Sequence, residues 1–276
     1  MMALLILPAG LLVLALLAAP MAILFRISLN RFSPTELMVE ALTLDNYAQA
    51  FRDPYYQNVL SSTLLMAFAC TLIALIIGFP AAYSLARMQS RWKSVVTILT
   101  LFPLFVGNVI RSAGWLALLG TDGAINATLK GTGIISSSFQ MMYTTGAVVV
   151  GIVAVVLPYM ILTLAAVIEG IPRQTEEAAA NLGARPVTVF RRVVLPLAMP
   201  GVAAGSVLVF ILCMNAYATP VLLGGPQFKM MAPAVYDQFV KGNNWPFGAA
   251  LAFLLLIVTL TLTAVGSTVL GRRYRR

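Results

Sequence analysis

Long apolar runs recur along the whole chain, separated by short polar and charged stretches. A helix that crosses a bilayer needs about 20 mostly apolar residues. Six segments reach that length, namely residues 3–27, 59–86, 95–119, 144–168, 202–223 and 249–270. The pattern predicts an all-α polytopic membrane protein with about six transmembrane helices. We divide it into residues 1–57, a first helix with a polar segment, and residues 58–276, the main membrane domain.

Composition agrees with this pattern, because 60% of the 276 residues are hydrophobic and only 10% are charged. An average soluble domain has about a quarter charged residues, so a soluble globule is excluded. The net charge is +9, and the basic residues behind it lie between the apolar runs, which favours a membrane protein over a nucleic-acid-binding one. Histidine is absent, which removes the commonest general base and metal ligand. Cys70 and Cys213 fall inside apolar runs and are expected to pack as free, small hydrophobic residues.

The basic residues also predict an orientation, since Lys and Arg accumulate in cytoplasmic loops. If the N-terminus is cytoplasmic, the inside segments carry more basic residues than the outside ones. The inside set is Arg87, Arg91, Lys93, Arg173, Arg185, Arg191, Arg192, Arg272, Arg273, Arg275 and Arg276. The outside set is Arg26, Arg31, Arg52, Lys130, Lys229 and Lys241. The bias predicts that both termini and the long loop of residues 169–200 are cytoplasmic.

Loop 169–200 contains residues that typically start and end helices, and they predict two short helices joined by a tight turn. Thr175 can cap a first helix, and Gly183 can end it in the left-handed conformation. Pro186 can open a second helix, and Pro196 is expected to close it before the next span. Such a loop fits a docking surface for a partner protein and an ordinary interfacial loop equally well.

A longer pattern in this loop points to the first of these alternatives. Glu177, Ala178 and Ala179 are followed after three residues by Gly183, and nine residues later by 193–196, which read Val-Val-Leu-Pro. This segment resembles the EAA loop of binding-protein-dependent ABC importer permeases, with Val193 where isoleucine is usual. The resemblance implies a type I ABC importer permease fold, and we call residues 169–200 the coupling loop.

The resemblance also implies a role for each matching residue. The first short helix would be the coupling helix that fits a cleft on an ATP-binding subunit, where Glu177 would pair with a basic group. Gly183 would permit the sharp turn, and Leu195 and Pro196 would set the angle into the fifth span. The chain has no phosphate-binding Gly-x-x-x-x-Gly-Lys-Ser/Thr loop. ATP and Mg are therefore expected on the partner ATPase, and this chain is expected to be no enzyme and to hold no cofactor or metal.

Four further segments are similar to the spermidine/putrescine branch of these permeases, nearest the first of its two permease subunits. They are residues 42–47, 110–115, 218–226 and 244–248. This likeness implies a bacterial cytoplasmic membrane, two ATP-binding subunits and an extracytoplasmic substrate-binding protein. It favours a heterodimer with a second homologous permease over a homodimer. The cargo would be a polyamine or a related small amino compound, although relatives in this branch carry opines and phosphonates.

Four polar residues in predicted spans are candidates for the substrate pathway. Arg111 and Asn108 lie in the third span, and Asn215 and Tyr217 in the fifth. A charged residue inside a membrane often marks a function, but a guanidinium suits an anionic group better than a cationic polyamine. Buried amides can equally bond neighbouring helices. The rival classes are an ion-coupled carrier or channel, and an intramembrane enzyme, and neither accounts for the coupling loop.

Overall fold

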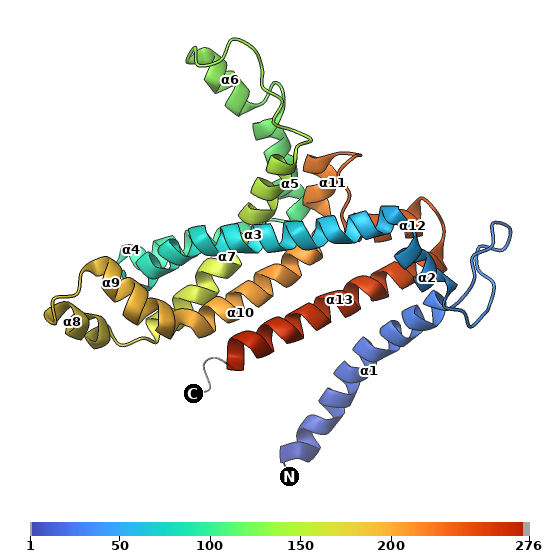
Figure 1. Cartoon of the computed structure of the whole chain (residues 1–276), viewed down its shortest axis with the longest axis horizontal. Helices are drawn as coiled ribbons and strands as arrows, with labels where there is room; N and C mark the ends of the chain where they lie inside the picture. Colours follow the sequence, from blue (N-terminus) through green and yellow to red (C-terminus); the bar gives the residue numbers. More distant parts are fainter. Residues whose placement is uncertain (1, 273–276) are drawn as a thin grey trace. The chain divides into compact units, whose positions relative to one another are not determined.

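The computed structural model describes the backbone of residues 2–272 and the side chains of residues 12–268. Within this part the chain folds into helices and loops, with one isolated bridge between Arg31 and Val39 (Figure 1). The all-α prediction is therefore confirmed. Arg273, Arg275 and Arg276, three of the basic residues expected on the cytoplasmic side, lie outside the described residues.

Four of the six predicted spans correspond to single long apolar helices at the expected places. Among the described residues, four stretches are long and apolar enough to cross a membrane: Pro54–Arg87 (α3), Thr145–Glu169 (α7), Pro186–Met214 (α9, η1 and α10) and Trp245–Thr268 in α13. A fifth candidate is a bent pair of helices. The first predicted span is α1, Met2–Ser28.

The prediction of one continuous third span over residues 95–119 is wrong. The chain forms α4, Trp92–Phe105, and α5, Asn108–Leu119, and the stretch Asn108–Gly131 that α5 opens is bent by 98° from α4. Val106 is extended (φ −88°, ψ 124°), and Gly107 follows with ψ 143°. Pro103 lacks an amide proton and weakens the last turn of α4, so the helix ends shortly after it.

The fifth span also differs from its predicted limits of 202–223. Helix α10, Leu195–Met214, ends well before residue 223, and α11, Ala218–Gly224, is a separate short helix. Pro196 does not close a helix either, because α9, Pro186–Val189, continues through the π-helical turn η1, Phe190–Val194, into α10. The amide of Leu195 donates to the carbonyl of Phe190, five residues back. A π turn is wider than an α turn, which leaves room for a proline ring directly after it.

The described chain divides into two compact units, each of which we describe by itself. The first unit comprises Met1–Ser61 and Met231–Val258, and it contains α1, α2 (Asp45–Arg52), α12 (Met231–Val240) and the first half of α13. Two pairs of aromatic rings pack edge to face within this unit. The ring centroids of Phe25 and Phe253 lie 5.3 Å apart, and those of Tyr56 and Phe247 lie 4.9 Å apart. Gln238 donates to the Tyr56 hydroxyl at 2.8 Å. These contacts join the two ends of the chain into one unit.

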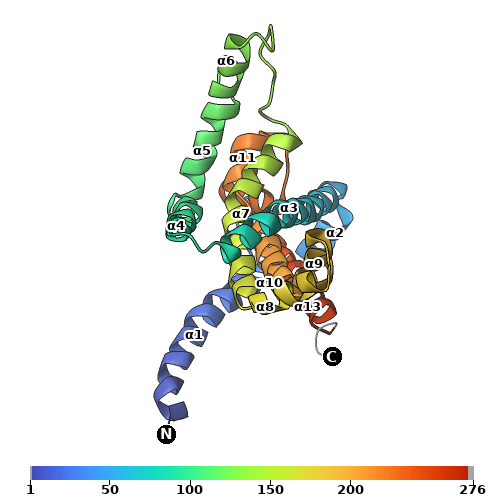
Figure 2. The ribbon, with the colours of Figure 1, turned by 90° about the vertical axis from the view of Figure 1, so that its left-hand side faces the viewer.

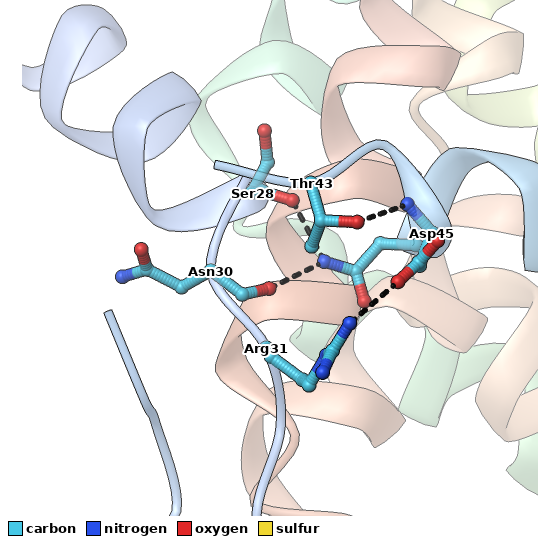
Figure 3. Close-up of polar contacts among 6 residues, drawn as sticks. Ser28, Asn30, Arg31, Thr43 and Asp45 are labelled. Carbon is cyan, nitrogen blue, oxygen red and sulfur yellow. Dashed lines mark hydrogen bonds and ion pairs between the residues drawn. The ribbon is translucent and has the colours of Figure 1, made fainter. Parts of the chain in front are cut away.

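A polar knot ties the end of α1 to α2 within the first unit (Figure 3). The buried Asn46 side chain donates to the carbonyl oxygens of Ser28 and Asn30, both at 2.8 Å. Ser28 Oγ also lies 2.7 Å from the Tyr47 hydroxyl. Thr43 Oγ1 accepts from the amide of Asp45 at 3.1 Å. The branch-like segment 42–47 therefore has a structural use, which is to satisfy carbonyl groups at the end of the first helix.

The second unit is built around α7 and α10. Gly201 and Gly205 of α10 let the two helices approach closely, since a Cβ there would lie 2.8 Å from Val167 Cβ and 2.9 Å from Met160 Sδ. Small residues at helix contacts are the usual means of packing helices in membranes. Cys70 and Cys213 are buried free thiols, as predicted. The coupling loop lies at one end of the α7 and α10 pair, and α11 lies at the other (Figure 1).

Helix α11 packs against α5 and α7 within the second unit. The buried hydroxyls of Ser112 and Thr219 lie 3.1 Å apart, which joins the two branch-like segments 110–115 and 218–226. Gly151 makes room for α11, because a Cβ there would lie 2.5 Å from Thr219 and Leu223. Figure 2 shows α5 continuing into α6, Ala124–Gly131, along one line away from α7.

Candidate functional site

The coupling loop contains the two short helices that the sequence predicts. Helix α8, Arg173–Asn181, begins after Pro172, so the prediction that Thr175 caps it is wrong. Gly183 has φ +84°, its amide donates to Ala180, and the next amide donates to the carbonyl of Ala179. This pair of bonds is the Schellman motif, which favours glycine at the left-handed position. Helix α9 then begins at Pro186, as predicted.

The two adjacent glutamates of α8 have different environments. The Tyr83 hydroxyl donates to Glu176 Oε2 at 2.7 Å, and Arg87 Nη2 forms an ion pair with Glu176 Oε1. The side chains of Arg87 and Glu176 are only 14% and 15% exposed. Glu177 is exposed on another face of the same helix, because neighbouring residues of an α-helix point about 100° apart. Glu177 is therefore accessible to a partner, whereas Glu176 is engaged within the chain.

Apolar side chains are exposed at the turn between α8 and α9. Leu182 is 89% exposed and Val187 is 69% exposed, and Ala178 is exposed one turn before Leu182. Exposed apolar residues grouped in this way are typical of a contact surface for another protein. Ala179, in contrast, is half-buried, so only part of the Glu-Ala-Ala run faces outward.

The second half of the coupling loop places the remaining motif residues at the π turn. Val193 and Leu195 are half-buried and Pro196 is exposed. They occupy the passage from η1 into α10, which is where the resemblance expects the loop to set the angle of the fifth span. Beside it lies a hollow of about 320 Å³, lined by Val187, Thr188, Arg191 and Arg192. Its two arginines give this side of the loop a positive charge.

Three of the four candidate pathway residues flank helix breaks, and the fourth, Arg111, lies in the first turn of α5. Asn108 opens α5, and its Oδ1 accepts from Arg111 Nη2 at 2.6 Å, while the same nitrogen lies 3.4 Å from the carbonyl of Val106. Asn215 follows the last residue of α10 and donates to Ile211 at 2.9 Å. Tyr217 directly precedes α11 and is 38% exposed. The Ser112 to Thr219 contact joins the two helices that carry these breaks.

Sequence reasoning missed Tyr83, Arg87 and Glu176 as a group, and also the Ser112 and Thr219 pair. The spacing of Tyr83 and Arg87, one turn apart at the end of a long apolar helix, was a visible signal. Their partner lies about 90 positions further along the chain, and only the tertiary fold brings it near. In the described residues no cluster of His, Cys, Asp and Glu could hold a metal ion.

Residues 74–276 match the family of binding-protein-dependent transport system inner membrane components. The chain belongs to this family. It is the membrane permease of an ABC importer, a transport component and not the ATPase, and permeases of this family work with ATPase subunits and a binding protein. The carrier, channel and intramembrane enzyme alternatives are set aside.

Known relatives cover most of the permease. The spermidine/putrescine transport system permease protein PotB of Escherichia coli K12 is 36% identical over 216 residues, 78% of each chain. PotB of Haemophilus influenzae is 34% identical over 224 residues, 81% of this chain and 78% of that protein. The molybdenum transport system permease protein ModB of Mycobacterium bovis is 31% identical over 213 residues, 77% of this chain and 79% of that protein. The resemblance to the spermidine/putrescine branch is thus confirmed.

Solved structures confirm the fold. A permease chain of a bacterial alginate ABC transporter, in complex with an alginate-bound periplasmic protein, matches with a TM-score of 0.82 and 16% identity, covering 99% of the permease and 95% of that chain. A chain of the MetNI methionine ABC transporter in an inward-facing conformation matches with a TM-score of 0.61 and 18% identity. The match covers 81% of the permease and 100% of that chain. The expected type I importer architecture is therefore present.

Proposed function

We propose that the permease forms half of the translocation pathway for a polyamine or a related small amino compound. A second, non-identical permease supplies the other half, and two ATPase subunits bind ATP and Mg and drive the cycle. Both termini and the coupling loop face the cytoplasm. The identity to two PotB proteins supports the choice of cargo, and the excess of basic residues in the coupling loop supports the orientation.

The observation that carries this proposal is that α8 binds the rest of the chain through Glu176 and leaves Glu177 exposed. Glu177 and Ala178 are exposed on α8, Leu182 is exposed directly after the helix, and Gly183 then reverses the chain direction. An ATPase subunit docks here, with a basic group of its own against Glu177. We assign the other motif residues, namely Ala179, Val193, Leu195 and Pro196, to the shape of the loop and its passage into α10. We assign Asn108, Asn215 and Tyr217 to the pathway because they flank helix breaks. Arg111 joins them because it donates to Asn108 and to the carbonyl of Val106 beside the first break.

Uptake by right-side-out membrane vesicles tests the proposal. The vesicles carry the permease with its co-expressed partner subunits and binding protein, and the probes are labelled putrescine and spermidine. Uptake should require ATP, and Glu177→Lys or Gly183→Asp should abolish both uptake and co-purification of the ATPase. Glu40→Lys, the same charge change at an exposed residue outside the coupling loop, should leave co-purification unchanged.

Two results would change the proposal in different ways. Unaltered ATPase association in both loop variants contradicts the docking surface. Absent polyamine uptake, with ATP hydrolysis still stimulated by a loaded binding protein, contradicts the polyamine cargo alone. In that case Arg111 favours a cargo with an acidic group, since a guanidinium pairs well with carboxylate or phosphonate oxygens.

A further inference from the structure

Three residues on one face of α3 hold the coupling loop by side-chain contacts. Phe79, Tyr83 and Arg87 are spaced four residues apart, so they lie above one another on the helix. Tyr83 and Arg87 both bind the carboxylate of Glu176 in α8, one oxygen each. Helix α3 therefore contacts the coupling helix through one hydrogen bond and one ion pair to the same carboxylate.

Backbone groups of the loop take part in the same contact. Arg87 Nη1 donates to the carbonyl oxygen of Ile171 at 3.0 Å, just before α8 begins. In return, Arg173 Nη2 donates to the carbonyl oxygen of Arg87 at 2.6 Å. Hydrogen bonds that involve an ionised group are stronger than neutral ones. The start of α8 and the end of α3 are thus fastened in both directions.

The second half of the loop is attached to the same face of α3. The ring of Phe190, the first residue of the π turn, lies 5.2 Å from Phe79 and 6.2 Å from Tyr83, edge to face in both cases. Such aromatic pairs contribute stability beyond the area they bury. One face of α3 therefore contacts both short segments of the coupling loop, α8 through Glu176 and η1 through Phe190.

These contacts add a third membrane helix to the two that the loop joins by the chain. The loop continues directly from α7 and into α10, so movement of the loop reaches those helices through the backbone. The loop is not continuous with α3, so its movement reaches α3 through contacts in space. Among these contacts Arg87 and Glu176 are sheltered from water, which keeps their attraction strong.

We propose that Tyr83, Arg87 and Glu176 are positioning residues that transmit the movement of the coupling loop to α3 during the ATP cycle. Glu176 acts within the chain, whereas its neighbour Glu177 faces the ATPase. This assignment rests on the proposed function, because it needs the ATPase to move the loop. If these residues only stabilised the loop, α3 would still move with the loop after one of them is replaced.

The test compares two reporters in the complete transporter, reconstituted with its partner subunits. A spin label is placed on the loop by Thr175→Cys or on α3 by Ser84→Cys, both at exposed positions, after the buried Cys70 and Cys213 have been replaced by alanine. ATP with vanadate traps the closed ATPase, so no cargo is required. In the parent protein both labels should change their spectra on trapping.

Glu176→Gln should separate the two reporters. It removes the charge and keeps the size of the side chain, so the loop label should still respond while the response at Ser84→Cys falls by about fivefold or more, the lower end of ordinary coupling between sites. The exchanged pair, Arg87→Glu with Glu176→Arg, should restore much of that response, and Tyr83→Phe should reduce it least. Glu177→Gln is the matched control, and it should weaken the responses of both labels together.

Each outcome has one meaning. An α3 response in Glu176→Gln equal to that of the parent overturns the proposal. The proposal is also overturned if the exchanged pair assembles but shows no larger α3 response than Arg87→Glu alone or Glu176→Arg alone. No response of either label in the parent protein overturns the proposed docking of the ATPase, and the transmission assigned to Glu176 falls with it. A selective loss at α3 with recovery in the exchanged pair supports it.

Discussion

The permease contains two contacts of the same chemistry in opposite surroundings. In the second unit, Arg87 pairs with Glu176 where both side chains are about 15% exposed. In the first unit, Arg31 pairs with Asp45 at 3.2 Å where the side chains are 68% and 70% exposed (Figure 3). Exposed ion pairs contribute little, because water and salt screen them. A sheltered pair is different, since removal of one partner leaves the other charge without compensation.

The difference shows how each unit fastens its loop. The coupling loop relies on the charged pair, which a change of loop position can strain or release. The segment between α1 and α2 relies on the buried amide of Asn46, and its ion pair lies outside that knot. The position of an arginine and a carboxylate in the fold, rather than their presence, decides what they do.

The largest effect is expected from Glu176→Ala. This change leaves the guanidinium of Arg87 sheltered from water without its carboxylate partner. Removing one partner of a buried ion pair lowers the free energy of unfolding by about 3–5 kcal/mol. The midpoint of thermal unfolding of the purified permease in detergent should fall clearly. Arg31→Ala is the matched control in the exposed pair, and equal losses in the two variants would contradict the comparison.

A smaller loss is expected from Asn46→Ala. The carbonyl oxygens of Ser28 and Asn30 lose a donor each, and an unsatisfied buried group costs about 1–3 kcal/mol. The same unfolding assay measures it, with Gln49→Ala, an exposed residue of the same helix, as the control. An unchanged midpoint would mean that water replaces the amide without cost.

Gly183→Ala should cost about 1–2 kcal/mol, the penalty of a left-handed backbone for a residue with a Cβ. No other atom lies within 4 Å of the position of that Cβ, so the cost comes from the backbone alone. Gly114→Ala is the matched control, because its surroundings are equally open and it lies within α5. That control should be neutral or slightly stabilising, and a loss of similar size in both variants would remove the role of the turn.

The smallest effect is expected from Asp45→Asn. A hydrogen bond from Thr43 and then the Arg31 guanidinium lower the pKa of the Asp45 carboxyl below its ordinary value of 3.8. A lowered pKa stabilises the fold above the ordinary value, and that contribution is lost as the pH falls through the lowered one. The difference in unfolding midpoint between Asp45→Asn and the parent should therefore stay constant from pH 5 to 8. A difference that changes across this range would show that another group titrates with Asp45.

Hydropathy predicted the place of four of the six membrane segments, because each must satisfy its backbone within itself and show apolar side chains to lipid. Turn chemistry was equally local: Gly183 and Pro186 mark the ends of α8 and α9 through their own backbone preferences. The motif from Glu177 to Pro196 likewise identified the family from the sequence, since it is read along a single loop.

The tertiary structure alone decided where the long helices break and which charge serves which partner. The sequence did not predict the bend after Phe105 or the separate α11, and the tertiary fold brings α5 and α11 together at these breaks through Ser112 and Thr219. Adjacent glutamates look alike in a sequence, yet Glu176 binds Tyr83 and Arg87 while Glu177 faces outward. The reason is physical, because the environment of a charge depends on residues far away in the chain, whereas propensity and hydropathy depend on residues close by.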